Sequence, residues 1–156
     1  MSEDQLLYLI PVVFPIFFAL VWIGVTSLLS VLSGWFTLMQ QFPNRDEKPL
    51  LQLNWQSGFM GTLPVNYRNV LKLGVCPSGL RIGVLRPFGL FAHDFFVPWH
   101  ALKAERKEYW MWQAVELSLG KPPIGRLMIY GSTADRIAEA AKGWPEITNV
   151  FKNTKR

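Results

Sequence analysis

Residues 6–32 read LLYLIPVVFPIFFALVWIGVTSLLSVL, an apolar run whose only clearly polar side chains are Thr26, Ser27 and Ser30. A helix rises about 1.5 Å per residue and the hydrocarbon core of a bilayer is about 30 Å thick, so about 20 such residues cross it. The run is long enough for one crossing and too short for two crossings joined by a turn. We therefore expect a single transmembrane helix, surrounded by lipid along residues 6–33.

A cleaved signal peptide is the alternative interpretation of this run. Signal peptides have a basic start, an apolar stretch of about 7–15 residues and a cleavage site of small residues. This chain starts with acidic Glu3 and Asp4, its apolar run is too long, and SVLSGWF at residues 30–36 contains no A-x-A site. The sequence therefore favours a permanent anchor.

The distribution of basic residues predicts the orientation of the helix. All sixteen Lys and Arg residues follow the apolar run, and Arg45 and Lys48 are the first of them. Segments with an excess of Lys and Arg stay in the cytoplasm, whereas acidic residues count little in this rule. We therefore expect the N-terminus outside, the C-terminal domain in the cytoplasm, and a location in the plasma (inner) membrane.

Two further features belong to the anchor segment, residues 1–43. Small residues recur at Gly24, Ser27, Ser30 and Gly34, and small residues allow a second membrane helix to approach closely. Such a face suits a homo-oligomer or a larger membrane complex, although small residues are also common in membrane helices generally. Residues 35–42 should form an amphipathic juxtamembrane helix, with Trp35 in the interfacial aromatic belt.

The remaining residues, 44–156, suffice for one small domain. They carry all sixteen basic and nine of the eleven acidic residues, a net charge of +7. Beside a membrane, such charge favours attraction to anionic lipid headgroups. Binding of nucleic acid is not expected, because the sequence has no helix-turn-helix, zinc-finger or RNP-like signature. Cys76 is the only cysteine, which excludes an intramolecular disulfide.

One hairpin can be predicted residue by residue. In residues 67–75 and 80–86, apolar side chains alternate so that one face of each strand is buried. CPSG at residues 76–79 suits a type I turn, because Pro is second and Gly is fourth. The register then has these opposing pairs: Val75 with Leu80, Lys72 with Gly83, and Gly74 with Arg81. Each long basic side chain has room beside a glycine.

Further strands are expected at about residues 55–62, 94–99, 101–108, 112–119 and 124–130. Residues 101–108 also have high helix propensity, but they lack an N-cap and lie between two strand-like runs. A helix should run from Ser132 or Thr133 to Lys142, with Ser132 and Asp135 as a capping box. The predicted fold class is α+β: a small barrel or sandwich of six or seven antiparallel strands in meander order, with a C-terminal helix.

Several short motifs resemble those of a known group of proteins. They are Ser33-Gly34-Trp35, residues 67–75, Gly79-Leu80, Arg86-Pro87-Phe88 and Val97-Pro98-Trp99. In these motifs the chain is similar to uncharacterised bacterial single-pass membrane proteins with a pleckstrin-homology-like (PH-like) cytoplasmic domain. The resemblance spans the chain from the membrane exit to about Lys142 and implies a PH-like fold. It implies no activity or cofactor, because the group has no agreed activity.

Cys76, His93 and His100 are the only candidates for catalysis or metal binding. The two histidines are seven residues apart, an odd spacing that puts them on opposite faces of a strand. No Cys-x-x-Cys or His-x-x-x-His pair occurs, and no glycine-rich segment joins a strand to a helix as a phosphate loop does. We therefore expect no metal, no cofactor and no enzyme activity. A thiol-dependent hydrolase or transferase is the alternative.

Two groups of outward side chains form the candidate binding surface. Trp110 and Trp112 should lie on the outer face of a strand, facing a protein or lipid headgroups unless the C-terminal helix covers them. Arg68, Lys72 and Arg81 form a basic stripe, with a solvated sheet face as the alternative. The sequence thus favours a membrane-anchored binding or scaffold protein that contacts lipid headgroups or an unknown membrane or cytoplasmic protein. A small accessory subunit of a membrane complex is a further alternative.

Overall fold

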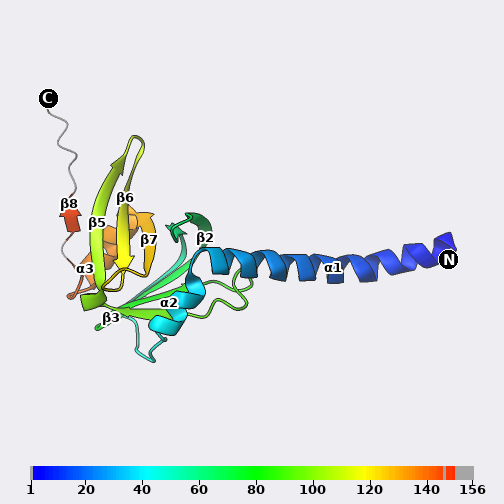
Figure 1. The fold of residues 1–156 in the computed structure, drawn as a ribbon, viewed down its shortest axis with the longest axis horizontal. Helices are drawn as coiled ribbons and strands as arrows, with labels where there is room; N and C mark the ends of the chain where they lie inside the picture. Colours follow the sequence, from blue (N-terminus) through cyan, green and yellow to red (C-terminus); the bar gives the residue numbers. More distant parts are fainter. Residues whose placement is uncertain (1, 146, 150–156) are drawn as a thin grey trace.

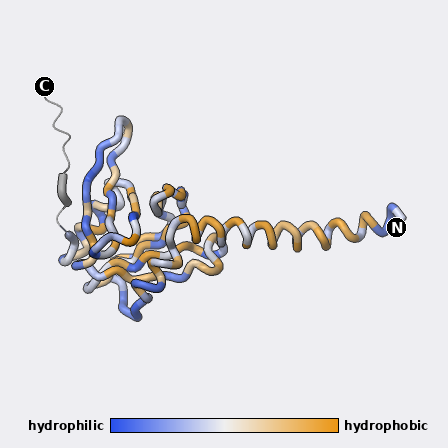
Figure 2. The backbone as a smooth tube through the Cα atoms, viewed as in Figure 1, coloured by the Kyte–Doolittle hydropathy of each residue, from blue (hydrophilic) through white to orange (hydrophobic). Residues whose placement is uncertain are grey.

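The computed structural model describes residues 2–145 and 147–149. Its longest element, α1 (Glu3–Leu32), projects from the folded domain with the N-terminus at its far end (Figure 1). Apolar residues line almost the whole of this helix (Figure 2). Within the described residues α1 is the one helix long and apolar enough to cross a membrane, and its most apolar stretch is unburied. It is the candidate membrane span that the sequence predicts.

The chain leaves α1 through a sharp turn and enters α2 (Trp35–Gln41). Gly34 makes this turn in the left-handed conformation, at φ +74°, which suits a residue without a Cβ atom. Trp35 is therefore directed into the domain, where it is fully buried with its ring centroid 5.1 Å from that of Phe95. Its Nε1 donates to the carbonyl oxygen of His93 at 2.9 Å. The expectation that Trp35 lies in the interfacial aromatic belt is wrong, because α2 packs into the domain core.

Seven antiparallel strands form one curled sheet, a half-barrel. They are β1 (Leu51–Met60), β2 (Val65–Val75), β3 (Gly79–Val84), β4 (Phe95–Pro98), β5 (Leu102–Tyr109), β6 (Trp112–Leu119) and β7 (Gly125–Tyr130). Their order is β4-β3-β2-β1-β7-β6-β5, so β1 pairs with β7 and joins two runs of neighbouring strands. The predicted meander is therefore interrupted between β4 and β5, where the short 3₁₀ helix η1 (Trp99–Ala101) carries the chain across. A short β8 (Ile147–Asn149), not anticipated from the sequence, pairs in parallel with β5.

Two detailed predictions about the sheet are confirmed. The β2–β3 hairpin has the expected register, with these opposing pairs: Val75 with Leu80, Lys72 with Gly83, and Gly74 with Arg81. The segment with ambiguous propensity is strand β5, which pairs with β6 from Leu102 opposite Leu119 to Tyr109 opposite Trp112. Backbone partners on β6 outweigh the helix propensity of this segment.

Two β-bulges bend the long strands β1 and β2. Their pairing shifts register beside Trp55 and beside Asn69, and these residues have positive φ angles of 58° and 55°. Asn tolerates the left-handed conformation, and the Asn69 amide donates to Ser57 Oγ at 2.8 Å. Bulges increase the local twist, which helps the sheet to curl.

The core lies inside the curl and collects apolar side chains from both halves of the sheet. Fully buried members include Leu71, Leu73, Ile82, Leu117 and Leu127. The helix α3 (Gly131–Ala140) packs against β6, β7 and β1 and adds Ala134 and Ile137 to the core. The chain thus combines a long apolar N-terminal helix, a curled antiparallel sheet and a C-terminal helix, in agreement with the predicted α+β class.

The start of α3 differs from the prediction. The helix begins at Gly131, with Tyr130 as N-cap and no capping side chain. The predicted capping box of Ser132 and Asp135 is therefore wrong. Asp135 instead forms an ion pair with Arg106 on β5 at 2.9 Å, because the helix starts directly from the end of β7 and turns this carboxylate toward the sheet.

Candidate interaction surface

The β5–β6 hairpin ends in a two-residue turn that is almost entirely exposed. Trp110 is 101% exposed and Met111 is 90% exposed, beyond the last strand pair of Tyr109 with Trp112. The hairpin extends past its neighbours and points across the axis of α1 (Figure 1). Two large apolar side chains are thereby presented to the surroundings.

Four aromatic rings behind the tip form one group, which we call the aromatic face: Phe59, Tyr109, Trp112 and Tyr130. The Trp112 ring stacks on Tyr109 with centroids 4.8 Å apart and planes at 14°. It also lies 5.3 Å from the Tyr130 ring and 6.2 Å from the Phe59 ring. These contacts fix the orientation of Trp112, whose side chain remains half-buried.

The aromatic face lies on the outer surface of the sheet, opposite α3. Along β6, Val115 and Leu117 are buried on the inner face, so alternation turns Trp112 outward. Inside the curl, α3 packs on the other face of the same strands. Within residues 2–145 and 147–149, the C-terminal helix therefore leaves both tryptophans uncovered. Trp112 occupies the outer position expected from the sequence, whereas Trp110 belongs to the turn.

The basic residues of the β5–β6 hairpin already have acidic partners. The pairs are Lys103 with Glu105 at 3.1 Å, Arg106 with Asp135 at 2.9 Å, and Lys107 with Glu116 at 2.6 Å. The hydrogen bond from Lys107 to Glu116 raises the pKa of this ammonium group, which therefore stays charged and paired. The hairpin therefore presents apolar rings beside basic side chains whose charge is balanced by neighbouring carboxylates.

The basic stripe is engaged within the domain to different extents. Lys72 Nζ forms an ion pair with Asp94 Oδ2 at 2.8 Å. Arg81 holds the connector, residues 43–50, by donating to the Asn44 side chain at 3.0 Å and to two backbone carbonyl oxygens at 2.6 and 2.7 Å. Arg68 is exposed near the start of β2. The stripe therefore combines one tethering residue, one ion-paired residue and one exposed residue.

Cys76 lies buried beneath the connector. Its thiol is 3.8 Å from the backbone carbonyl oxygens of Glu47 and Gly74. Burial raises the pKa of the Cys76 thiol, and the positive charge of Arg81 opposes this only in part. The thiol is therefore protonated at neutral pH, whereas a nucleophilic cysteine reacts as the thiolate.

The two histidines lie on separate elements. His93 lines a polar cavity of about 340 Å³ together with Lys72, Arg86 and Asp94, whereas His100 is exposed in η1. Among the residues that the structure describes, no group of three or more His, Cys, Asp or Glu side chains could hold a metal ion. Two of the charged residues that line the cavity, Lys72 and Asp94, are paired with each other.

The small residues of the anchor, Gly24, Ser27, Ser30 and Gly34, do not form one exposed face. Ser30 is buried, and Gly34 forms the turn after α1. Next to them, Ser33 Oγ and Tyr67 Oη form a hydrogen bond of 3.0 Å that ties the end of α1 to β2. Burial raises the pKa of Tyr67, which therefore stays a neutral phenol. Gly24 is exposed and Ser27 half-buried, so the part of the face nearest the domain packs against this same chain.

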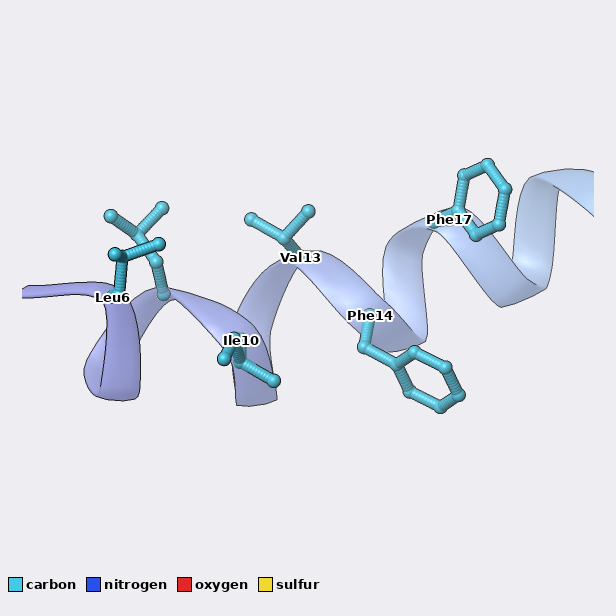
Figure 3. Close-up of a pocket in the computed structure, with 6 residues that line it drawn as sticks. Leu6, Ile10, Val13, Phe14 and Phe17 are labelled. Atoms are coloured by element: carbon cyan, nitrogen blue, oxygen red, sulfur yellow. The ribbon is translucent and has the colours of Figure 1, made fainter. Parts of the chain in front are cut away.

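An open apolar groove follows the N-terminal half of α1. It measures about 430 Å³ and is lined only by apolar side chains, among them Leu6, Ile10, Val13, Phe14 and Phe17 (Figure 3). Small-molecule sites usually add a few polar groups that orient the ligand. A purely apolar groove on an exposed helix instead suits lipid acyl chains.

Comparison of the chain with family models, curated proteins and solved structures finds no match. The surfaces must therefore be interpreted from their own geometry. Sequence reasoning found the two tryptophans but missed Phe59, Tyr109 and Tyr130, which complete the aromatic face. A two-residue turn at Trp110 and Met111 would have predicted that Tyr109 lies opposite Trp112. Phe59 reaches the aromatic face only because β1 pairs with β7, which no local sequence pattern predicts.

Proposed function

We propose that this protein is a single-pass membrane scaffold whose folded domain binds a partner protein through the tip of the β5–β6 hairpin and the aromatic face. The full exposure of Trp110 carries the proposal. Tryptophan is enriched among the residues that dominate binding energy at protein interfaces, and exposed apolar groups often mark such interfaces. The rigid stack of Trp112 on Tyr109 supplies a pre-ordered surface behind the tip.

Two observations favour a protein partner over lipid headgroups at this surface. The hairpin points across the axis of α1 and lies at the end of the domain remote from that helix (Figure 1). Its basic residues are paired with carboxylates, so an anionic headgroup would have to displace an existing partner. Apolar rings beside neutralised charge suit a protein surface better than a phosphate-rich one.

The proposal includes a PH-like fold, an outside N-terminus and a cytoplasmic domain. Seven antiparallel strands with a C-terminal helix agree with what the resemblance implies. The confinement of Lys and Arg to the chain after α1 supports the orientation. No nucleic-acid-binding role is proposed, since the charge lies beside a membrane anchor without a recognition motif.

Binding by the full chain in detergent tests this function. Affinity purification with mass spectrometry should recover a partner whose yield falls at least tenfold, about 1.4 kcal/mol of binding, in Trp110→Ala and in Trp112→Ala. Trp55→Ala is the matched control, because Trp55 is an exposed tryptophan on β1. Equal loss in the control would indicate a nonspecific apolar contact. Recovery that requires added anionic lipid would instead favour headgroup binding.

The alternatives make different predictions. A thiol-dependent hydrolase or transferase requires a reactive Cys76, yet burial raises the pKa of that thiol. Fast labelling of Cys76 by an activity-based thiol probe at neutral pH would favour the enzyme. An accessory subunit or homo-oligomer would be joined through the exposed side of α1, so that crosslinking from Gly24 should capture the neighbouring helix.

A further inference from the structure

The β3–β4 loop, residues 85–94, runs back from the domain along α1 (Figure 1). The ring of Phe88 packs against that of Trp22, with centroids 6.0 Å apart. Trp22 lies ten residues before the last residue of α1, which corresponds to about 15 Å of helix. The loop therefore reaches far along the segment that is apolar enough to lie in a membrane.

The tip of this loop exposes apolar side chains in a compact backbone. Phe88, Leu90 and Phe91 are all exposed, and Phe91 retains 52% of its surface. The Phe88 amide donates to the Leu85 carbonyl oxygen at 3.0 Å, and Gly89 is buried beneath the tip. The three side chains are thus displayed by an ordered turn.

The length of α1 shows where a bilayer would fit. Its 30 residues span about 45 Å, whereas the hydrocarbon core is about 30 Å thick. The apolar residues from Leu6 to Trp22 span about 25 Å, and a run of about 17 residues is the shortest that crosses a bilayer. The clearly polar residues of the apolar run all follow Trp22: Thr26, Ser27 and Ser30. Tryptophan itself is enriched at the membrane interface.

We propose that the hydrocarbon boundary on the domain side lies at Trp22 and that the β3–β4 loop inserts Phe88, Leu90 and Phe91 into the interface between headgroups and acyl chains. Arg86, exposed at the start of the loop, is placed to contact lipid phosphates. The inference rests on α1 crossing the membrane and not on the binding of a partner protein. Two membrane contacts fix the orientation of the domain, with the β5–β6 hairpin directed across the membrane normal.

Site-directed spin labelling of the full chain tests the depth of the loop. Single cysteines are introduced in a Cys76→Ala background as Phe91→Cys, Leu28→Cys and Leu50→Cys, all at exposed positions. The protein is reconstituted into vesicles of phosphatidylcholine and phosphatidylglycerol. Collisions with oxygen and with a water-soluble nickel complex then report the depth of each label. Leu50 is the control, because it lies beside Val75 at the opposite end of β2 from the loop.

The expected depths differ between the three positions. The label at 91 should lie at the interfacial depth of about 5–10 Å that amphipathic segments reach, with high oxygen and low nickel accessibility. The label at 28 should lie outside the hydrocarbon, since it is about 9 Å beyond Trp22. The label at 50 should be in water. A water-like label at 91, or a label at 28 within the hydrocarbon, would overturn the inference.

Discussion

The two ends of the domain use tryptophan in opposite ways. At the end joined to α1, Trp35 is fully buried beside Phe95, and its indole nitrogen has a hydrogen-bond partner. At the hairpin end, Trp110 is fully exposed. The same residue type thus holds the anchor to the domain at one end and is left available for binding at the other. Position in the fold, and not residue type, therefore decides which tryptophan is packed in the core and which is exposed to a binding partner.

Removal of the Trp35 ring should reduce stability, whereas removal of the Trp110 ring should reduce binding. Trp35→Ala should lower the free energy of unfolding by about 3–5 kcal/mol, the usual cost of deleting a large buried aromatic side chain. Trp110→Ala should change it by less than about 0.5 kcal/mol while weakening partner binding. Guanidinium unfolding of the full chain in detergent, followed by circular dichroism, measures both. Similar losses of stability in the two variants would contradict the division between the ends.

The basic stripe should show the same division within one sheet face. Arg81→Ala should cost about 1.5–3 kcal/mol, because its charged hydrogen bonds hold the connector. Lys72→Ala should cost about 1 kcal/mol or less, since its ion pair is partly exposed. Arg68→Ala should have almost no effect on stability. The same unfolding measurement ranks the three, and an equal cost at Arg68 would show that the stripe acts as one structural unit.

Sequence patterns predicted the parts of this fold that depend on near neighbours. The β2–β3 register followed from alternation and the CPSG turn, because a shift by one residue would turn every apolar side chain to the wrong face. The predicted meander order is confirmed within β1–β4 and within β5–β7 but is wrong between β4 and β5, which are not neighbours. Pairing of β1 with β7 depends on how the sheet closes on itself, and no local pattern encodes that partner.

The role of Trp35 could not be predicted for a related reason. Its position after an apolar helix is typical of an interfacial anchor, and Gly34 alone does not reveal the direction of the following turn. The direction is set by contacts far along the chain, with Phe95 and the carbonyl of His93. Likewise the exposure of Trp110 depends on the hairpin turn occurring at that residue and not one position later.

Glycine substitutions should distinguish a packed position in the sheet, Gly83 on β3, from an open position, Gly24 on α1. A Cβ atom at Gly83 would overlap the Asp94 carboxylate and lie 2.9 Å from Lys72 Cε, so it would push this ion pair apart. Gly83→Ala should therefore destabilise the domain by about 1 kcal/mol or less, because what it disrupts is this partly exposed ion pair. Gly24→Ala is the control, because no atom lies within 4 Å of its added Cβ. Differential scanning fluorimetry should show a lower Tm for the first variant only.

The smallest expected effect is a pH dependence that arises from Cys76. Burial raises the pKa of its thiol above the ordinary value of 9.0, so the folded state holds this proton more tightly than the unfolded state does. The resulting stabilisation is fully present below pH 9.0 and decreases as the pH rises through the higher pKa of the folded state. Unfolding free energies measured between about pH 8 and pH 10 should fall in the wild type and fall less in Cys76→Ala. An identical slope in both proteins would show that the thiol is as accessible to solvent as the hairpin tip, which would remove Cys76 from the packed part of the domain.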